Sequence, residues 1–134
     1  MSMVKLSTKK LHKGEHLFKE GDIAQEAYLI KSGYVSIWKT EDSQRVNLAT
    51  KVEGEIIGEM ALIDDTTRSA TVTAQSDVEV EIITKVQLEA MLSNAPETLS
   101  AILHQLLESL RNSNDLITMY ASRPVSNELR KNQT

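Results

Sequence analysis

Cysteine is absent from this chain of 134 residues. Without thiols there is no disulfide framework, no thiolate metal site and no cysteine nucleophile. Long apolar runs are absent too, since none approaches the ~18 residues that a membrane-spanning helix needs. The first ten residues, MSMVKLSTKK, are basic but carry no apolar stretch of the kind found in secretory signals. We therefore expect a cytoplasmic protein that makes no contact with membranes.

Positive charge is scarce. The chain has 15 lysines and arginines against 19 aspartates and glutamates, which gives a net charge of −4. A free-standing nucleic-acid binder normally shows a basic surface, so we expect no direct nucleic-acid binding. Histidine is scarce as well: His12, His16 and His104 lie in no carboxylate pattern typical of a metal site, so we expect no metal.

All five glycines lie in the first half of the chain, between or at the ends of short apolar runs. Glycine supplies the positive φ that tight turns need, so the runs indicate strands joined by turns. Two of them, 71–74 and 78–82, alternate with a period of two, as half-buried strands do. The other expected strands are 28–30, 35–38, 46–48 and 55–57. Many short strands in close succession indicate a sandwich, barrel or jelly roll.

From Lys85 onward there is no glycine, and the apolar period becomes helical. A short helix is expected to end near Ser93, and Pro96 suits the first turn of a longer helix over 97–120. The longer helix carries one apolar stripe with steps of four and three residues, interrupted by Ser113. The stripe is suited to packing against the strands, and also to pairing with a second copy of the chain.

The expected fold class is therefore mainly β with C-terminal helices. We expect a double-stranded β-helix, that is, a jelly-roll-like β-roll, over residues 4–84 and helices over 85–120. The domain as a whole is expected to span 1–122, with a polar tail over 123–134.

Residues 54–74, GEIIGEMALIDDTTRSATVTA, carry the most chemical information. A strand enters Gly58, residues 59–63 suit a short helix, 64–67 a solvated loop, and a second strand is expected from Arg68. The first turn of a helix presents N–H groups that attract an anion. An arginine adds a bidentate, charge-assisted contact to a phosphate. Glu59 offers a carboxylate that accepts a hydrogen bond from a ribose hydroxyl.

The charges around this segment narrow the ligand class. Between Lys51 and Lys85, Arg68 is the only basic residue among eight acidic ones. Such surroundings repel a triphosphate or a nucleic-acid backbone. One cation suits a ligand with a single negative charge, and a cyclic phosphodiester is such a ligand.

Gly58-Glu59-Met60-Ala61-Leu62, followed by Arg68-Ser69-Ala70-Thr71, resembles the phosphate-binding cassette of the cyclic-nucleotide-binding family. That family includes the sensor domains of catabolite activator protein and of the regulatory subunits of cyclic-AMP-dependent protein kinase. The resemblance covers nearly the whole chain. Residues 13–15 and 20–22 resemble the family's opening turns, Gly33 its next turn, and 110–114 its C-helix.

The resemblance implies roles for individual residues. Glu59 would bind the ribose 2′-hydroxyl and Arg68 the cyclic phosphate, with backbone around Gly58 and Ala70 completing the cradle. Ser69 would contact the phosphate or, in guanine-selective members, the base. Leu62 would be the switch residue. The full predicted ligand-binding set is Ile57, Gly58, Glu59, Met60, Ala61, Arg68, Ser69, Ala70, Val72, Ser113 and Asn114, the last two facing the base.

The predicted function is that of a ligand-dependent sensor that performs no chemistry, with cyclic AMP favoured as ligand. Cyclic GMP is the alternative ligand, and a degenerate scaffold that has lost ligand binding is the alternative role. No helix-turn-helix follows the C-helix and no kinase or channel sequence is present, so the effector protein or domain is unidentified. A homodimer through the C-helix is a further predicted partner.

An enzymatic function is the least favoured interpretation of the sequence. Jelly rolls include metal-dependent cupins, which hold a metal with His-x-His and a following Glu, but the β-rich half has no His-x-His. Nucleophilic catalysis would need cysteine, or a serine activated by a nearby histidine. The alternative for Glu59 and Arg68 is a surface ion pair. On the sensor reading Arg68 serves the ligand rather than the core, so its replacement is expected to leave the fold intact.

Overall fold

The computed structural model describes residues 5–121, and for 114–121 it describes the backbone alone. The chain divides into two compact units, residues 1–94 and 95–134. Because the described residues end at 121, the predicted tail over 123–134 lies outside them. No helix among the described residues is long and apolar enough to span a membrane.

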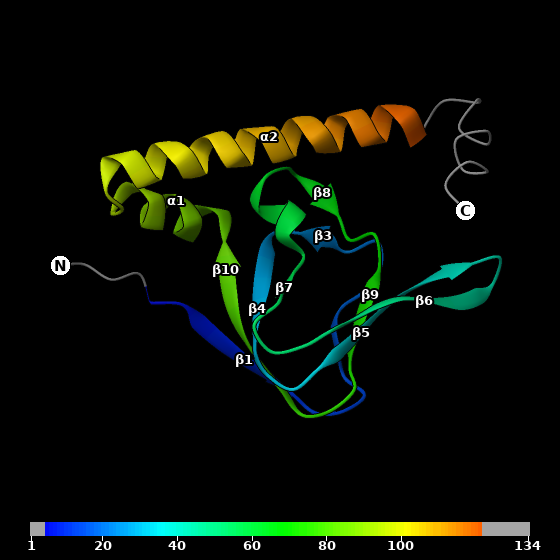
Figure 1. The fold of residues 1–134 in the computed structure, drawn as a ribbon. Coiled ribbons are helices and arrows are strands. Elements are labelled where there is room, and N and C mark those ends of the chain that lie inside the picture. Colours follow the sequence, from blue (N-terminus) through cyan, green and yellow to red (C-terminus); the bar gives the residue numbers. More distant parts are fainter. Residues whose placement is uncertain (1–4, 122–134) are drawn as a thin grey trace. The chain divides into compact units, whose positions relative to one another are not determined.

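The first unit is built on two four-stranded antiparallel sheets (Figure 1). The first sheet has the order β1 (Ser7–Leu11), β10 (Val78–Thr84), β4 (Glu26–Ser32) and β7 (Ile56–Ile57). The second has the order β2 (His16–Phe18), β9 (Thr71–Ala74), β5 (Val35–Glu41) and β6 (Gln44–Lys51). A two-stranded ribbon joins β3 (Ile23–Ala24) to β8 (Thr66–Thr67). Together with two helices after the last strand, these sheets confirm the predicted β-roll followed by helices.

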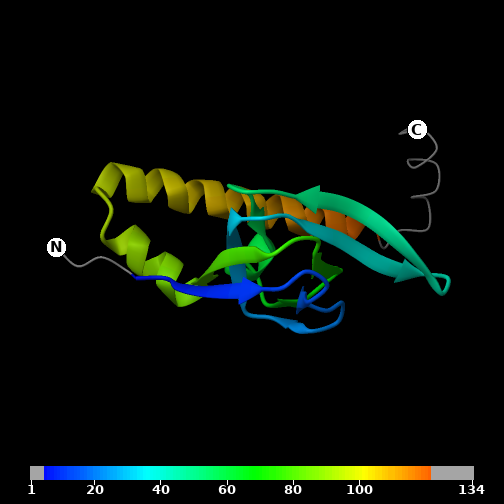
Figure 2. The same cartoon turned by 90° about the horizontal axis from the view of Figure 1, so that it is seen from below.

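The core lies between the two sheets. Apolar residues at alternate positions of β10 point inward, so Val78 and Val80 are buried and pair with Leu11 and Ile30. The second sheet supplies Leu17, Val35, Val72 and Ala74 from its inner face. The β5–β6 hairpin extends past the other strands of this unit (Figure 2) and is mostly exposed.

The described chain has three helical segments, one between β7 and β8 and two after β10. A single 3-10 turn, η1 (Glu59–Leu62), begins after Gly58, whose φ of 72° lies in the left-handed region that glycine favours. Helix α1 (Lys85–Ser93) begins with a reciprocal capping box between Thr84 and Gln87. Helix α2 (Glu97–Ala121) forms the described part of the second unit.

Part of the expected strand pattern is wrong. Strands β1, β2, β3 and β8 were not predicted, and residues 66–67, expected in a loop, pair with β3. The strand expected to begin at Arg68 begins at Thr71. The reason is that the Arg68 backbone is already used, since its N–H donates to the Asp22 carbonyl and its carbonyl accepts from the Gly21 N–H.

Candidate functional site

A cavity of about 200 Å³ opens at one end of the first unit. Its walls come from β2, β3, β5, the segment from β7 through η1 and β8, and the start of β9. Within the part of the chain that the structure describes, Glu59 and Arg68 are the only charged residues that line it. The lining residues are Phe18, Ala24, Ile37, Ile57, Gly58, Glu59, Met60, Ala61, Thr66, Thr67, Arg68, Ser69, Ala70 and Val72.

The floor of the cavity is a row of apolar side chains across three strands. Phe18 on β2 pairs with Val72 on β9, which in turn pairs with Ile37 on β5. The register of β2 shifts between His16 and Phe18. Because Val72 and Thr73 point to opposite faces of β9, this bulge places Phe18 on the cavity side, while His16 contacts Thr73 on the other side.

The Arg68 side chain is buried, with 7% of its surface exposed. Its Nη2 donates a hydrogen bond of 2.7 Å to the backbone carbonyl of Glu26. Its Cζ lies 4.0 Å from the ring centre of Phe18 and 5.6 Å from that of Tyr28. Arg68 thus packs as a core residue as well as lining the cavity, so the expectation that it serves no structural role is wrong.

One polar atom of Arg68 has no partner. Its Nε is buried and makes no hydrogen bond within the described part of the chain. A buried donor without an acceptor costs about 1–3 kcal/mol. The site therefore holds a fixed cation whose hydrogen-bonding capacity is incompletely used.

Gly58 allows the chain to pass close to this cation. A Cβ placed on Gly58 would lie 2.6 Å from Nη1 of Arg68 and 3.6 Å from the Glu26 carbonyl oxygen. Only a residue without a side chain fits this position while the guanidinium stays where it is. The positive φ of Gly58 adds a second reason for glycine.

The Glu26 carboxylate accepts a hydrogen bond from a neighbour on its own strand. The Tyr28 hydroxyl donates to Oε1 of Glu26 at 2.6 Å, because residues two apart share a face of β4. Burial, with the nearby Glu26 carboxylate second, raises the pKa of Tyr28 well above its ordinary value. Tyr28 is therefore a neutral donor at physiological pH, and Glu26 meets Arg68 through its backbone carbonyl.

Glu59 differs from Arg68 in being exposed. Its carboxylate makes no hydrogen bond or ion pair with any of residues 5–113, so the surface ion pair with Arg68 does not form there. Ser69 is exposed at the rim, and Leu62 is half-buried in η1, which contacts β4 and α1.

The structure brings together nine of the predicted ligand-binding residues, those from Ile57 to Val72. Ser113 is exposed on α2, in the second unit, and the Asn114 side chain lies outside the described residues. Sequence reasoning missed Phe18, Ile37 and the Glu26 carbonyl. For Phe18 the only available signal was an aromatic residue three positions before a glycine turn. The bulge that orients its side chain cannot be recognised from the alternation of apolar and polar residues in the sequence.

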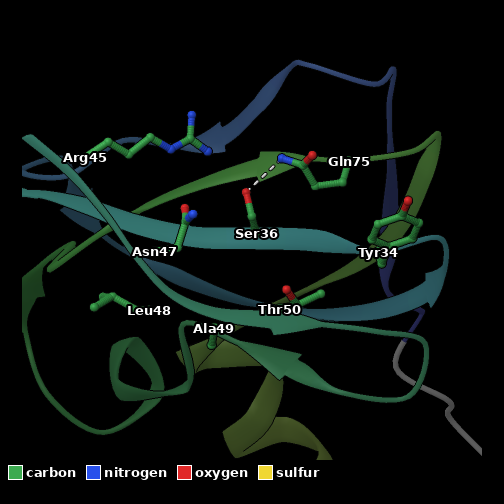
Figure 3. Close-up of a pocket in the computed structure, with 8 residues that line it drawn as sticks. All are labelled: Tyr34, Ser36, Arg45, Asn47, Leu48, Ala49, Thr50 and Gln75. Carbon is green, nitrogen blue, oxygen red and sulfur yellow. Dashed lines mark hydrogen bonds between the residues drawn. The ribbon is translucent and has the colours of Figure 1, made fainter.

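A second hollow, of about 500 Å³, lies on the face of the β5–β6 hairpin (Figure 3). Gln75 points toward Ser36 there and donates to its hydroxyl at 2.9 Å. Arg45 is its only charged lining residue, and the Arg45 guanidinium lies 4.2 Å from the ring centre of Trp38. This hollow is larger but more open and holds no buried charge, so the cavity beside Arg68 is the better candidate. Among the described residues, no three His, Asp or Glu side chains form a metal-binding group.

Comparison with known proteins identifies the family of the chain. The sequence model of the cyclic nucleotide-binding domain matches residues 8–95. The cyclic AMP receptor protein of Thermus thermophilus is 32% identical over 82% of this chain. The regulatory subunit of cAMP-dependent protein kinase from Candida albicans is 34% identical over 70%. The chain spans 53% and 20% of the lengths of these two relatives.

Among solved structures, a halfsite-occupied form of the EAL enzyme Bd1971 matches with a TM-score of 0.78 and 40% identity. The match covers 82% of this chain and 99% of that one. The same enzyme is known in cAMP-bound and cGMP-bound forms, with TM-scores of 0.60 and 0.62. The family match covers well over half of this sequence, and it falls on the unit that contains the cavity. The chain belongs to the cyclic nucleotide-binding domain family.

Proposed function

We propose that this domain binds a cyclic nucleotide in the cavity beside Arg68 and performs no chemistry on it. The observation that carries the proposal is Arg68, a residue that is 7% exposed and whose buried Nε has no hydrogen-bond partner among the described residues. A phosphate oxygen that reached this nitrogen would satisfy it, with a charge-assisted bond in place of an unmet donor. Because Nε is buried, a small movement of the cavity wall must accompany binding.

Three other lining residues are suited to accommodate the rest of the ligand. Glu59 is exposed at the cavity and has an uncommitted carboxylate, which suits it to accept a hydrogen bond from the ribose 2′-hydroxyl. Ser69 follows Arg68 directly and offers a hydroxyl at the rim. Gly58 leaves room for a ligand beside the guanidinium because it has no side chain.

Cyclic AMP is the favoured ligand. Ser69, and the polar pair Ser113 and Asn114 on α2, resemble the residues of bacterial cyclic-AMP sensors. Two of the similar proteins are named for cyclic AMP, whereas the EAL enzyme is known with cyclic GMP as well. A serine beside the phosphate also suits a guanine amino group, so cyclic GMP is the second candidate.

We propose that ligand capture is reported by a population shift. Leu62 lies in η1, which lines the cavity with Met60 and Ala61 and also contacts α1. A ligand that draws η1 inward would move Leu62, and it can bias the equilibrium only by its preference for that state. The effector that reads this movement is unidentified, and a homodimer through the apolar stripe of α2 is one route to it.

Contact of Ser113 and Asn114 with the base is part of the same proposal. Amide exchange on α2, measured with and without cyclic AMP, tests it. If the helix closes over the base, exchange should slow around residues 110–120 as well as over 58–70. Slowing that is confined to 58–70 would show that α2 takes no part.

Isothermal titration of the domain with cyclic AMP and with cyclic GMP tests the proposed function. We expect saturable binding to one site for each, tighter for cyclic AMP. A clear preference for cyclic GMP would reverse the base assignment. Absence of binding to either would show that the domain is a scaffold whose cavity no longer takes a ligand.

A further inference from the structure

Arg68 is held through both its backbone and its side chain. Its backbone N–H and carbonyl are bonded to the turn at residues 21–22. Its Nη2 is bonded to the Glu26 carbonyl at 2.7 Å. Its Cζ lies over the Phe18 ring, 4.0 Å from the ring centre, and 5.6 Å from the ring centre of Tyr28. Phe18 is thus the nearer of the two aromatic side chains beside the guanidinium.

Phe18 is itself held in place by its neighbours. Its ring stacks on Tyr28, with ring centres 5.9 Å apart and an interplanar angle of 30°. It packs against the core cluster, and the bulge in β2 turns it toward the cavity. An aromatic face attracts a guanidinium by its quadrupole, and the attraction is strongest where water is excluded. The burial of Arg68 places this contact in such surroundings.

The hydrogen bond to Glu26 cannot orient the guanidinium by itself. One bond through Nη2 leaves the plane free to rotate about the line joining donor and acceptor, and Nε would turn with it. The ring of Phe18 restricts this rotation, because the guanidinium Cζ lies over the ring at 4.0 Å from its centre. Phe18 is therefore placed to limit the directions in which Nε can point.

We infer that Phe18 is a positioning residue for the phosphate-binding cation: it orders the Arg68 guanidinium so that Nε is aimed in advance at the ligand's phosphate. The expected effect of Phe18 on ligand affinity rests on the proposed function. The ordering of Arg68 itself is a property of the ligand-free protein. The two can therefore be tested separately.

The test compares Phe18→Leu, Phe18→Met and Phe18→Tyr with the wild type. Leucine and methionine keep an apolar side chain but remove the ring, whereas tyrosine keeps the ring. Val78→Ala is the matched control, because it removes buried apolar volume from β10 and does not line the cavity. Thermal melts establish which variants fold, and two different ring-free variants guard against one failing to do so.

Two quantities are measured on each folded variant. The first is the NMR order parameter of the Arg68 Nε–H bond without ligand. In the wild type, Phe18→Tyr and Val78→Ala we expect an order parameter of about 0.85, the value typical of rigid backbone. In the ring-free variants we expect it to fall below about 0.6. The second is the affinity for cyclic AMP by isothermal titration, expected to fall about 3- to 30-fold in the ring-free variants and to stay at the wild-type value in Val78→Ala.

The outcomes separate the two hypotheses. If the wild type binds no cyclic nucleotide, the proposed function fails, and the order parameters still decide whether Phe18 orders Arg68. If the ring-free variants keep an ordered Nε–H bond, the inference is overturned. Weaker binding with an ordered Arg68 would mean that Phe18 acts by touching the ligand directly.

Discussion

Replacing Arg68 with alanine should lower both the stability of the domain and its affinity for cyclic AMP, by amounts that can be separated. On the stability side, the Glu26 carbonyl loses the donor that lies 2.7 Å away. A buried acceptor left unsatisfied costs about 1–3 kcal/mol, and the lost contact with Phe18 adds to it. The same substitution removes the unpartnered Nε, which offsets part of the cost. We expect a net loss of about 1–3 kcal/mol.

On the binding side, the ligand's phosphate would lose its only cationic partner among the cavity residues. Truncating one partner of a buried, hydrogen-bonded charge pair costs about 2–5 kcal/mol. This corresponds to a loss of affinity of roughly 30-fold to several thousand-fold. The expected loss of binding free energy therefore reaches higher values than the expected loss of stability, and the two ranges overlap between about 2 and about 3 kcal/mol.

Urea unfolding with and without cyclic AMP measures both effects in one assay. At a ligand concentration of about one hundred times the wild-type Kd, the ligand should add about 2.7 kcal/mol to wild-type stability. The same concentration should add only about 0.9 kcal/mol to a variant with 30-fold weaker affinity, and less than about 0.1 kcal/mol after a 1,000-fold loss.

Arg68→Lys is the matched variant, because it keeps the charge but not the planar fork of donors. It should bind better than Arg68→Ala and worse than the wild type. If Arg68→Ala is stabilised by cyclic AMP as much as the wild type is, the phosphate does not bind at Arg68 and the reasoning is refuted.

Three further predictions follow from the same contacts. Glu59→Gln should reduce discrimination between cyclic AMP and its 2′-deoxy form, and equal binding of the two by the wild type would show that Glu59 does not contact the ribose. Gly58→Ala should cost about 1–2 kcal/mol of stability and weaken cyclic AMP binding at least about tenfold, because its Cβ would meet Arg68 Nη1 at 2.6 Å. Gly54→Ala is its control, since Gly54 also has a positive φ but no atom within 4 Å of a Cβ; titration showing the same loss of affinity in both would contradict the steric argument. The raised pKa of Tyr28 means that its neutral form stabilises the fold fully below its ordinary value of 10.0, and that this contribution is lost as the pH rises above it. Between about pH 9 and about pH 11, urea unfolding should show a total fall of about 1.4 kcal/mol in the wild type beyond that in Tyr28→Phe, and parallel profiles would show that Tyr28 ionises normally.

The sequence predicted that the residues from Gly58 to Ala70 lie together, because they are close along the chain, and they line one cavity. Their role in ligand binding stays a prediction. Gly58, Glu59 and Arg68 lie within eleven residues, and the strand after them alternates clearly. One turn of helix and one short loop cannot carry these residues far apart, so their meeting in one cavity follows from the spacing alone. The switch from alternating to helical periodicity near Lys85 likewise placed the end of the β-roll, which the capping box at Thr84 confirms.

The parts that were missed depend on contacts between distant segments. Strand β1 is mostly exposed and carries lysines, so neither its composition nor its alternation indicates a strand. These residues form a strand because they pair with β10. Burial of Arg68 depends on the Glu26 carbonyl and on Phe18, which are 42 and 50 residues away along the chain. A backbone acceptor leaves no mark in a sequence, and the bulge that turns Phe18 inward is set by its partner strand.

The most direct test of the central claim compares cyclic AMP with linear 5′-AMP in isothermal titration of the wild-type domain. The cyclic diester carries one negative charge, whereas a phosphate monoester carries about −1.5 to −2 near pH 7. The cavity offers one arginine and one glutamate, and acidic residues surround them in the sequence. We predict saturable one-site binding of cyclic AMP and at least about 100-fold weaker binding of 5′-AMP. Equal affinity for the two, or no binding of cyclic AMP, would contradict the assignment of this cavity to a cyclic phosphodiester.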